Sequence, residues 1–277
     1  MDFNREVPGV PGAAVRRVAS LPAALADAEP AGQFAVAKPG QLLLDIPGAA
    51  RFLVRDGETI DVAANPDADP GVVRLVLNGS ARGALIYQRG DLPLHAASLV
   101  PPGGDGAFAI CGAAGAGKST LAVELSRRGW LLVADDTSRI TWEKDHPVVW
   151  PSRDSIKLWR DACEANGLDV AGLERVTRDL DKYYVRVPAR GGPVRLAAVV
   201  ELMTDGPGRA EVLSVGERLS LLTRHAYRQS YIRPLGRQAG FVRLAAQVAG
   251  ACRTVQLSGA RARPVRELAD DVEQMAR

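Results

Sequence analysis

The chain has 277 residues, 47% hydrophobic and 24% charged, so one large α/β domain, or a catalytic domain with a small appendage, can bury its own core without disulfide staples. Its 35 basic and 32 acidic residues give a net charge of only +3, and the arginines are scattered, which argues against a nucleic-acid-binding protein. Three cysteines without metal-ligand spacing, no secretory leader and no long apolar run predict a cytoplasmic protein that does not span a membrane.

The sequence of the first 90 residues predicts a lead-in, a small β-rich unit and a helix. Residues 1–32 contain much Ala, Pro, Gly and charge without periodicity, which predicts a weakly ordered lead-in. Short apolar segments separated by turn residues then predict a small N-terminal β-rich subdomain over residues 33–90, with its strongest hairpin signal at Asp56-Gly57. Residues 72–86 predict a helix, which Asn78-Gly79 could divide into two pieces.

The predicted catalytic domain, residues 91–277, opens with two strands and a glycine-rich loop. The first strand, residues 94–100, is predicted from a largely apolar run that includes His95. The second strand, residues 108–111, runs into Gly112-x-x-x-x-Gly117-Lys118-Ser119, the Walker A form of a phosphate-binding P-loop. Glycines let the backbone approach a phosphate closely, and the next helix's N-terminus attracts its charge. The spacing therefore predicts nucleotide binding by Gly112, Ala113, Ala114, Gly115, Ala116, Gly117, Lys118, Ser119 and Thr120.

Two aspartates follow the next predicted strand. Residues 130–134 are continuously apolar, as in a buried parallel strand, and end in Asp135-Asp136. Ligands of α/β sheets gather at the carboxyl ends of strands, so one or both carboxylates should face the Mg²⁺ and the γ-phosphate of ATP. Lys118 should reach the β- and γ-phosphates, and Ser119 should bind Mg²⁺. A second carboxylate suits proton acceptance from an attacking hydroxyl, which is kinase chemistry.

These residues resemble a known family. The run from Gly115 to Thr120, with Leu132-Val-Ala-Asp-Asp136, resembles the catalytic domain of HPr kinase/phosphorylase, and Leu94-His95-Ala-Ala-Ser98 resembles the histidine segment before that family's P-loop. Other segments resemble the smaller HPr-kinase-like proteins, some of which phosphorylate serine on precursors of lasso peptides; they include Gln88-Arg89-Gly90, Ile156-Lys-Leu-Trp159 and Lys182-Tyr-Tyr184.

The resemblance implies an α/β fold with a P-loop kinase core of HPr-kinase type and a mixed sheet. It implies that Asp136 accepts the proton, that Asp135 assists and binds the metal with Ser119, and that His95 contacts the transferred phosphate or a carboxylate. The acidic, glycine-rich metal-binding segment of HPr kinases has no counterpart after Asp136, which makes HPr itself a poor expectation as substrate.

The remaining chain offers two candidate contacts for an anionic acceptor. Arg233 precedes Pro234 in an irregular segment, and its planar guanidinium suits a carboxylate or phosphate; Lys182 is the second candidate. Lys157 and Arg153 suit either phosphate contact or a solvated basic face. Near the C-terminus, Val265, Leu268, Val272 and Met275 form one apolar stripe typical of core packing.

Three functions fit this sequence. The first is an ATP-dependent kinase that phosphorylates a serine hydroxyl of a peptide or small protein, including the C-terminal serine of a lasso-peptide precursor. The second is a kinase of the same fold that acts on a small-molecule hydroxyl. The third is an ATP-dependent switch that hydrolyses or senses nucleotide, for which Glu143 is the only nearby residue able to orient water. The sequence leaves homo-oligomerisation open.

Overall fold

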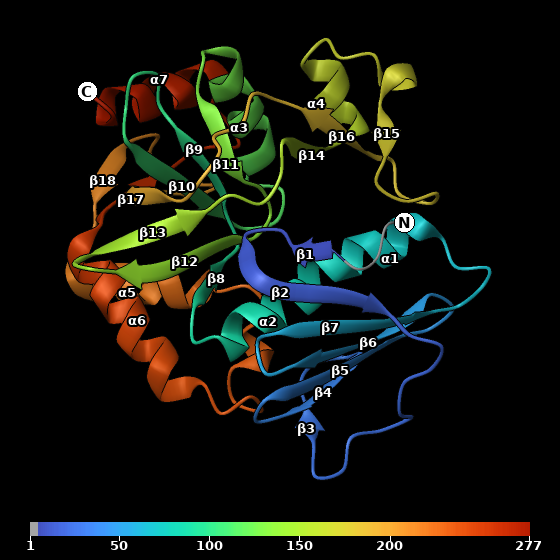
Figure 1. Cartoon of the computed structure of the whole chain (residues 1–277). Coiled ribbons are helices and arrows are strands. Elements are labelled where there is room, and N and C mark those ends of the chain that lie inside the picture. The colour runs from blue at the N-terminus through green and yellow to red at the C-terminus, as the bar shows by residue number, and fades with distance from the viewer. Residues whose placement is uncertain (1–4) are drawn as a thin grey trace. The chain divides into compact units, whose positions relative to one another are not determined.

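The computed structural model describes residues 5–277 and shows a mixed α/β protein (Figure 1). Contacts divide the chain into two units. The first contains the described chain up to Pro93, together with Arg175–Asp181 and Tyr227–Leu244. The second contains Leu94–Glu174, Lys182–Ala226 and Ala245–Arg277. No helix of the described chain is both long and apolar enough to cross a membrane.

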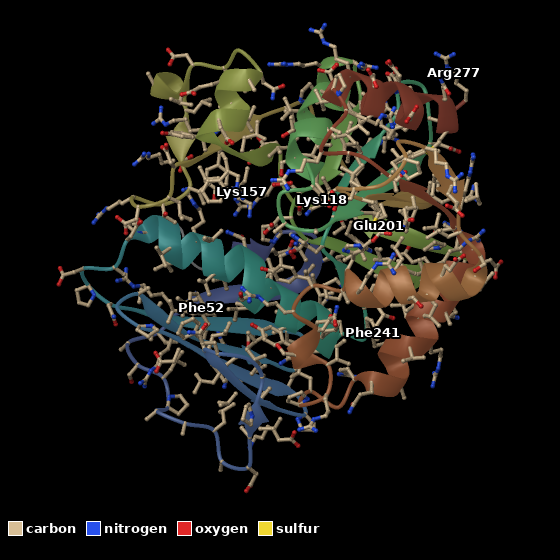
Figure 2. All side chains as sticks on the ribbon, turned by 180° about the vertical axis from the view of Figure 1, so that it is seen from behind. Phe52, Lys118, Lys157, Glu201, Phe241 and Arg277 are labelled. Atoms are coloured by element: carbon tan, nitrogen blue, oxygen red, sulfur yellow. The ribbon has the colours of Figure 1, made fainter. Side chains whose placement is uncertain are left out.

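The first unit contains a seven-stranded sheet in the order β1-β2-β7-β6-β5-β4-β3. Its strands are β1 (Arg5–Val7), β2 (Val10–Arg17), β3 (Glu29–Pro30), β4 (Ala35–Lys38), β5 (Gln41–Ile46), β6 (Ala50–Arg55) and β7 (Thr59–Ala64). The hairpin predicted at Asp56-Gly57 is confirmed, since β6 and β7 pair antiparallel and both turn residues have positive φ. Phe52, labelled in Figure 2, is fully buried in this unit.

Ordered strands occupy much of the segment for which the sequence predicts weak order. Val10, Ala13 and Val15 are buried in β2, which runs parallel to β7. Arg82 and Arg89 donate from Nε and Nη1 to the carbonyls of Pro8 and Pro11 at 2.8 Å. Pro11 and Gly12 are both exposed between buried Val10 and Ala13, so β2 does not alternate strictly and the sequence pattern alone does not indicate it.

A single helical segment follows the sheet. It consists of α1 (Pro70–Val76), a π-helical turn (Leu77–Ala81) and α2 (Arg82–Gln88). The π-helical turn contains Asn78 and Gly79, where the sequence suggested a division. A Cβ at Gly79 would lie 2.8 Å from the Tyr227 hydroxyl, so glycine lets this ring pack closely against the turn.

The second unit contains the glycine-rich loop and a mixed sheet of nine strands. Its main path runs β11-β9-β10-β17-β13-β12-β8, while β19 pairs with β17 and β18. The strands are β8 (Leu92–Leu94), which begins in the first unit, β9 (Ala97–Val100), β10 (Gly106–Gly112), β11 (Leu131–Ala134), β12 (Ser138–Glu143), β13 (His146–Trp150), β17 (Val194–Leu202), β18 (Ala210–Val212) and β19 (Arg253–Leu257).

Helices and a small second sheet complete this part of the chain. The helices are α3 (Lys118–Arg127), α4 (Arg160–Ala165), α5 (Val215–Arg224), α6 (Gln238–Ala251) and α7 (Val265–Met275), with 3₁₀ turns at Val170–Gly172 and Gln229–Tyr231. The second sheet has the order β14-β16-β15, formed by β14 (Ser155–Trp159), β16 (Lys182–Arg186) and β15 (Glu174–Arg175). Helix α6 and strand β15 include residues of both units.

One apolar core holds α3, α7 and the mixed sheet together. Leu121, Leu125 and Trp130 are buried in it, and Trp130 meets Phe108 edge-on at 5.4 Å between ring centroids. The predicted packing stripe of α7 is confirmed, because Leu268 and Val272 are buried and Val265 and Met275 pack against the same core.

Candidate functional site

The glycine-rich loop connects β10 to α3, as its sequence predicts. All of β10 is buried, and α3 begins at Lys118. Gly112 and Gly117 have φ values of 152° and 91°, which side chains rarely adopt. A Cβ at Gly112 would also lie 2.8 Å from the Leu202 carbonyl oxygen. The loop therefore depends on glycine both for its backbone conformation and for close packing on β17.

Lys118 folds back over this loop. Its Nζ donates to the carbonyl oxygens of Gly112 at 2.7 Å and Ala113 at 3.0 Å. Burial lowers the pKa of Lys118, while the negative charges of Asp136 and Asp135 oppose the shift. The ammonium group is thus held at the loop, where a phosphate oxygen could replace the carbonyl partners.

The two aspartates lie at the same sheet edge as the loop, although their strand is not directly paired with β10. Antiparallel β9 lies between β10 and β11, so β11 runs in the same direction as β10. The sequence-based description of β11 as a parallel strand therefore needs correction, since its paired neighbour β9 is antiparallel to it. The carboxyl ends of β10 and β11 still share one edge.

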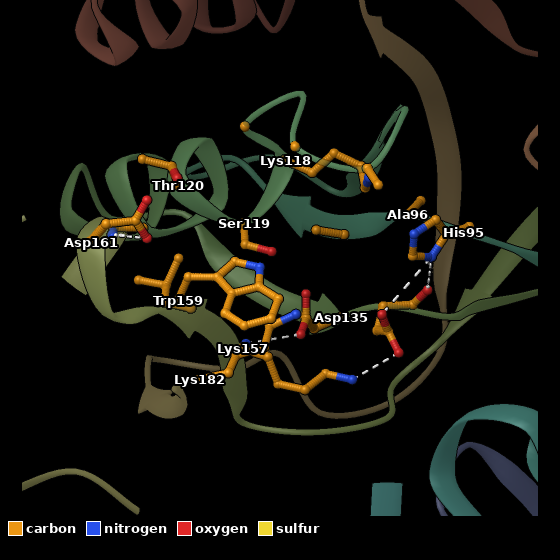
Figure 3. A pocket seen from close by; sticks show the side chains of 17 residues that line it. His95, Ala96, Lys118, Ser119, Thr120, Asp135, Lys157, Trp159, Asp161 and Lys182 are labelled. Atoms are coloured by element: carbon orange, nitrogen blue, oxygen red, sulfur yellow. Dashed lines mark hydrogen bonds and ion pairs between the residues drawn. The ribbon is translucent and has the colours of Figure 1, made fainter. Parts of the chain in front are cut away.

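Asp136 is held by two neighbours. Its Oδ2 accepts a 2.8 Å hydrogen bond from Lys157 Nζ, and His95 Nδ1 lies 2.7 Å from its carbonyl oxygen and 3.9 Å from Oδ1 (Figure 3). Burial acts to raise the pKa of Asp136, but Lys157 and His95 outweigh it and the net shift is downward. The backbone of Asp136 is left-handed, with φ of 68°.

Asp135 has a different environment. Its side chain is buried, and Oδ2 accepts a 3.1 Å hydrogen bond from the backbone N–H of Lys157. Burial raises the pKa of Asp135, although the charge of Lys157 opposes the shift. Lys157 therefore contacts both carboxylates, with its backbone on one and its ammonium on the other.

These groups line one pocket of about 360 Å³, all of it within the second unit. The predicted residues that line it are His95, Ala114, Gly115, Gly117, Lys118, Ser119, Thr120, Asp135, Asp136 and Lys182. Lys157, Trp159 and Asp161 also line the pocket. The alternation Ile156, Lys157, Leu158, Trp159 is the sequence signal for two of these, because it places Lys157 and Trp159 on the face of β14 opposite the buried apolar residues.

The donor set suits Mg²⁺. Ser119 and Asp135 both bring oxygen ligands to the pocket, and Mg²⁺ prefers one or two carboxylates together with phosphate oxygens and water. Among residues 5–277, no group of three or more His, Cys, Asp or Glu side chains forms a metal cage. Gly115 and Gly117 face open space where a Cβ would stand, so the loop leaves room for a phosphate.

Arg233 belongs to the first unit. There its guanidinium forms a 2.8 Å ion pair with Glu29, and both side chains are exposed. Arg233 does not line the described pocket, and its role toward an acceptor stays a prediction.

A buried carboxylate lies on the strand beside β10. Glu201 of β17 is opposite Cys111 and accepts hydrogen bonds from Arg224 at 2.8 and 2.5 Å and from Gln256 at 2.8 Å. His225 Nε2 lies 2.5 Å from its Oε1, and the His225 carbonyl accepts the backbone N–H of His95 at 2.8 Å. This cluster, Glu201 with Arg224, His225 and Gln256, thus connects the strand beside the loop to the pocket histidine.

The chain is similar to a number of solved structures. No protein-family model matches the sequence, and no curated protein matches it significantly. Among solved structures, the Hpr(Ser) kinase/phosphatase from Coxiella burnetii matches 66% of this chain and 87% of its own, with a TM-score of 0.36 and 16% identity. That protein belongs to the family that the sequence resembles.

Proposed function

We propose that the protein is an ATP-dependent kinase that transfers the γ-phosphoryl group to the serine hydroxyl of a peptide or small protein. The observation that carries this proposal is the convergence of the P-loop, Lys118, Ser119 and two unlike aspartates on one pocket. Phosphoryl transfer requires mainly positioning and charge neutralisation, and these groups supply both. The C-terminal serine of a lasso-peptide precursor is the acceptor that the segment resemblance favours.

Each residue then has a defined task. The loop N–H groups and Lys118 hold the phosphates, and Ser119 and Asp135 would hold Mg²⁺. Mg-ATP would supply the transferable phosphoryl group when bound, and its Mg²⁺ would neutralise the negative charge on that group. Asp136 accepts the hydroxyl proton on a carboxylate oxygen, and Lys157 fixes the orientation of that carboxylate.

His95 holds the backbone of Asp136 in place. The Asp136 carbonyl accepts a hydrogen bond from Nδ1–H of His95, which defines the tautomer in which Nδ1 carries the proton. This hydrogen bond stabilises the left-handed backbone conformation of Asp136. His95 is therefore assigned as a positioning residue.

The pocket's lining disfavours the switch protein. Water activation in nucleotide switches commonly uses a positioned glutamine. Among the described residues that line the pocket, none is Gln or Glu. Glu143, the residue considered for this task, accepts instead from the Thr141 hydroxyl at 3.1 Å.

The deciding experiment is transfer from γ-labelled ATP, with Mg²⁺, to a panel of serine-containing peptides with and without a C-terminal serine. We expect label on serine with the wild-type protein and a loss of about 100-fold or more with Asp136→Asn. Asparagine tolerates left-handed φ, so this variant removes the charge with little backbone strain. Asp105→Asn, at an exposed position, is the matched control.

Labelling that survives Asp136→Asn unchanged would refute the role of Asp136. Label on a polyol or amino alcohol but on no peptide would replace the peptide acceptor by a small molecule.

A further inference from the structure

Trp159 is exposed in an unusual place. It ends β14 and precedes α4, and 51% of its surface is accessible although it lines the pocket. Tryptophan is usually largely buried, because its indole carries much apolar surface. An indole left open beside a phosphate-binding loop offers a flat apolar surface to a ligand.

One face of this indole is already occupied. Lys182 is the cross-strand neighbour of Trp159 in β16, and its Nζ lies 5.1 Å from the ring centroid. This cation–π contact holds the ring in orientation. A planar ligand would therefore stack on the opposite face.

The pocket has two chemically different ends. Figure 3 shows Thr120, Asp161 and Trp159 on its left-hand side, and Lys118 and His95 on its right. Asp136 is at the end with His95, whose Nδ1 lies 2.7 Å from the Asp136 carbonyl oxygen. The reacting phosphate must lie near Lys118 and Asp136, given the proposed function on which this inference rests. The rest of a nucleotide then extends past Thr120 toward Trp159.

Asp161 supports that direction. It is exposed in the first turn of α4, where Oδ1 accepts the Ala162 backbone N–H at 2.8 Å. A carboxylate would repel a phosphate, but it accepts hydrogen bonds well from ribose hydroxyls. The end of the pocket at Trp159 thus suits a nucleoside rather than a second phosphate.

We propose that Trp159 and Asp161 form the nucleoside subsite of this pocket, with the base stacked on the indole and the ribose hydroxyls donating to the carboxylate. Stacking on an aromatic ring accepts every base, because each has a π face, and favours the larger purines. The ligand class is a purine nucleoside di- or triphosphate.

The test compares two probes by titration calorimetry: Mg-ADP, which carries a base, and Mg-pyrophosphate, which lacks one. Trp159→Ala should weaken Mg-ADP binding by about 5- to 100-fold, which corresponds to the stacking contribution of one base. Pyrophosphate binding should change less than twofold. Trp159→Phe should retain most of the Mg-ADP affinity, since an aromatic face remains.

Tryptophan fluorescence gives a second readout. Mg-ADP should quench the wild-type emission and that of Trp142→Phe, a control in β12, but should not quench that of Trp159→Phe. Equal Mg-ADP affinity in wild type and Trp159→Ala, with pyrophosphate bound by both, would overturn the subsite and leave the P-loop assignment intact. A wild-type protein that binds neither probe would overturn the P-loop assignment and the subsite together.

Discussion

Glutamate 201 should contribute substantially to stability, and its contribution should depend on pH. Its side chain, labelled in Figure 2, is only 2% exposed. It accepts hydrogen bonds from Arg224 and Gln256 and lies beside His225. Burial acts to raise the pKa of Glu201, but these partners lower it from 4.5 to about 2. A difference of this size corresponds to about 3 kcal/mol of folding free energy.

The sign of the pH dependence follows from the depressed pKa. The stabilisation is fully present above the unfolded-state pKa of 4.5 and is lost as the pH falls through the folded-state value of about 2. Glu201→Gln should therefore reduce the free energy of unfolding by about 3 kcal/mol at pH 7, and by progressively less below pH 4.5. Urea unfolding followed by circular dichroism, from pH 7 downward, measures this difference.

The matched control is Glu211→Gln. Glu211 is exposed on β18, and its ion pair with Arg209 is long, at 4.0 Å. Loss of the Glu211 charge should therefore change the free energy of unfolding by no more than about 0.5 kcal/mol. Two results would refute this account of the cluster. One is a destabilisation by Glu201→Gln of less than about 1 kcal/mol at pH 7. The other is a destabilisation that does not change between pH 7 and the lowest pH at which the protein stays folded.

Three further substitutions test the pocket. Lys118→Met should abolish transfer and reduce thermal stabilisation by Mg-ATP, because the charge that holds phosphate is removed; a shift equal to that of wild type would contradict the P-loop assignment. Asp135→Asn should weaken Mg²⁺-dependent nucleotide binding, measured by calorimetry, more than Asp136→Asn does, and the reverse order would exchange their roles. Lys157→Met should lower kcat by about 100-fold with a small change in ATP affinity, as expected for a misoriented carboxylate, and Lys157→Arg should recover part of the rate; normal kcat in Lys157→Met would contradict its orienting role.

The sequence indicates the loop and aspartates well because their geometry is local. Glycine spacing determines where the backbone can take positive φ, and a continuous apolar run ending in Asp135-Asp136 marks a strand end. The contact of Asp136 with Lys157 crosses 21 positions and depends on how β14 packs, which no local pattern encodes. The strand β2 near the N-terminus is also missed, because exposed Pro11 and Gly12 interrupt its alternation.

Trp159 and Lys157 show where alternation carries more information than residue type. A lysine after an apolar residue reads equally as a solvated base or as a ligand contact. Lys157 and Trp159, at i and i+2, alternate with buried Ile156 and Leu158 and therefore lie on one face of the strand. That face extends along the pocket, so a single strand supplies both the partner of the aspartates and the exposed indole.

The place of His95 follows from the mixed character of the sheet. The rule that ligands gather at the carboxyl ends of strands applies to β10 and β11, which run in the same direction. Between them β9 runs the opposite way, so its beginning, not its end, lies at the ligand edge. Residues just before an inserted antiparallel strand therefore meet the same pocket as those just after its parallel neighbours. His95, two positions before β9, reaches the Asp136 carbonyl across 41 positions for this reason, and a purely parallel sheet would have placed it at the opposite edge.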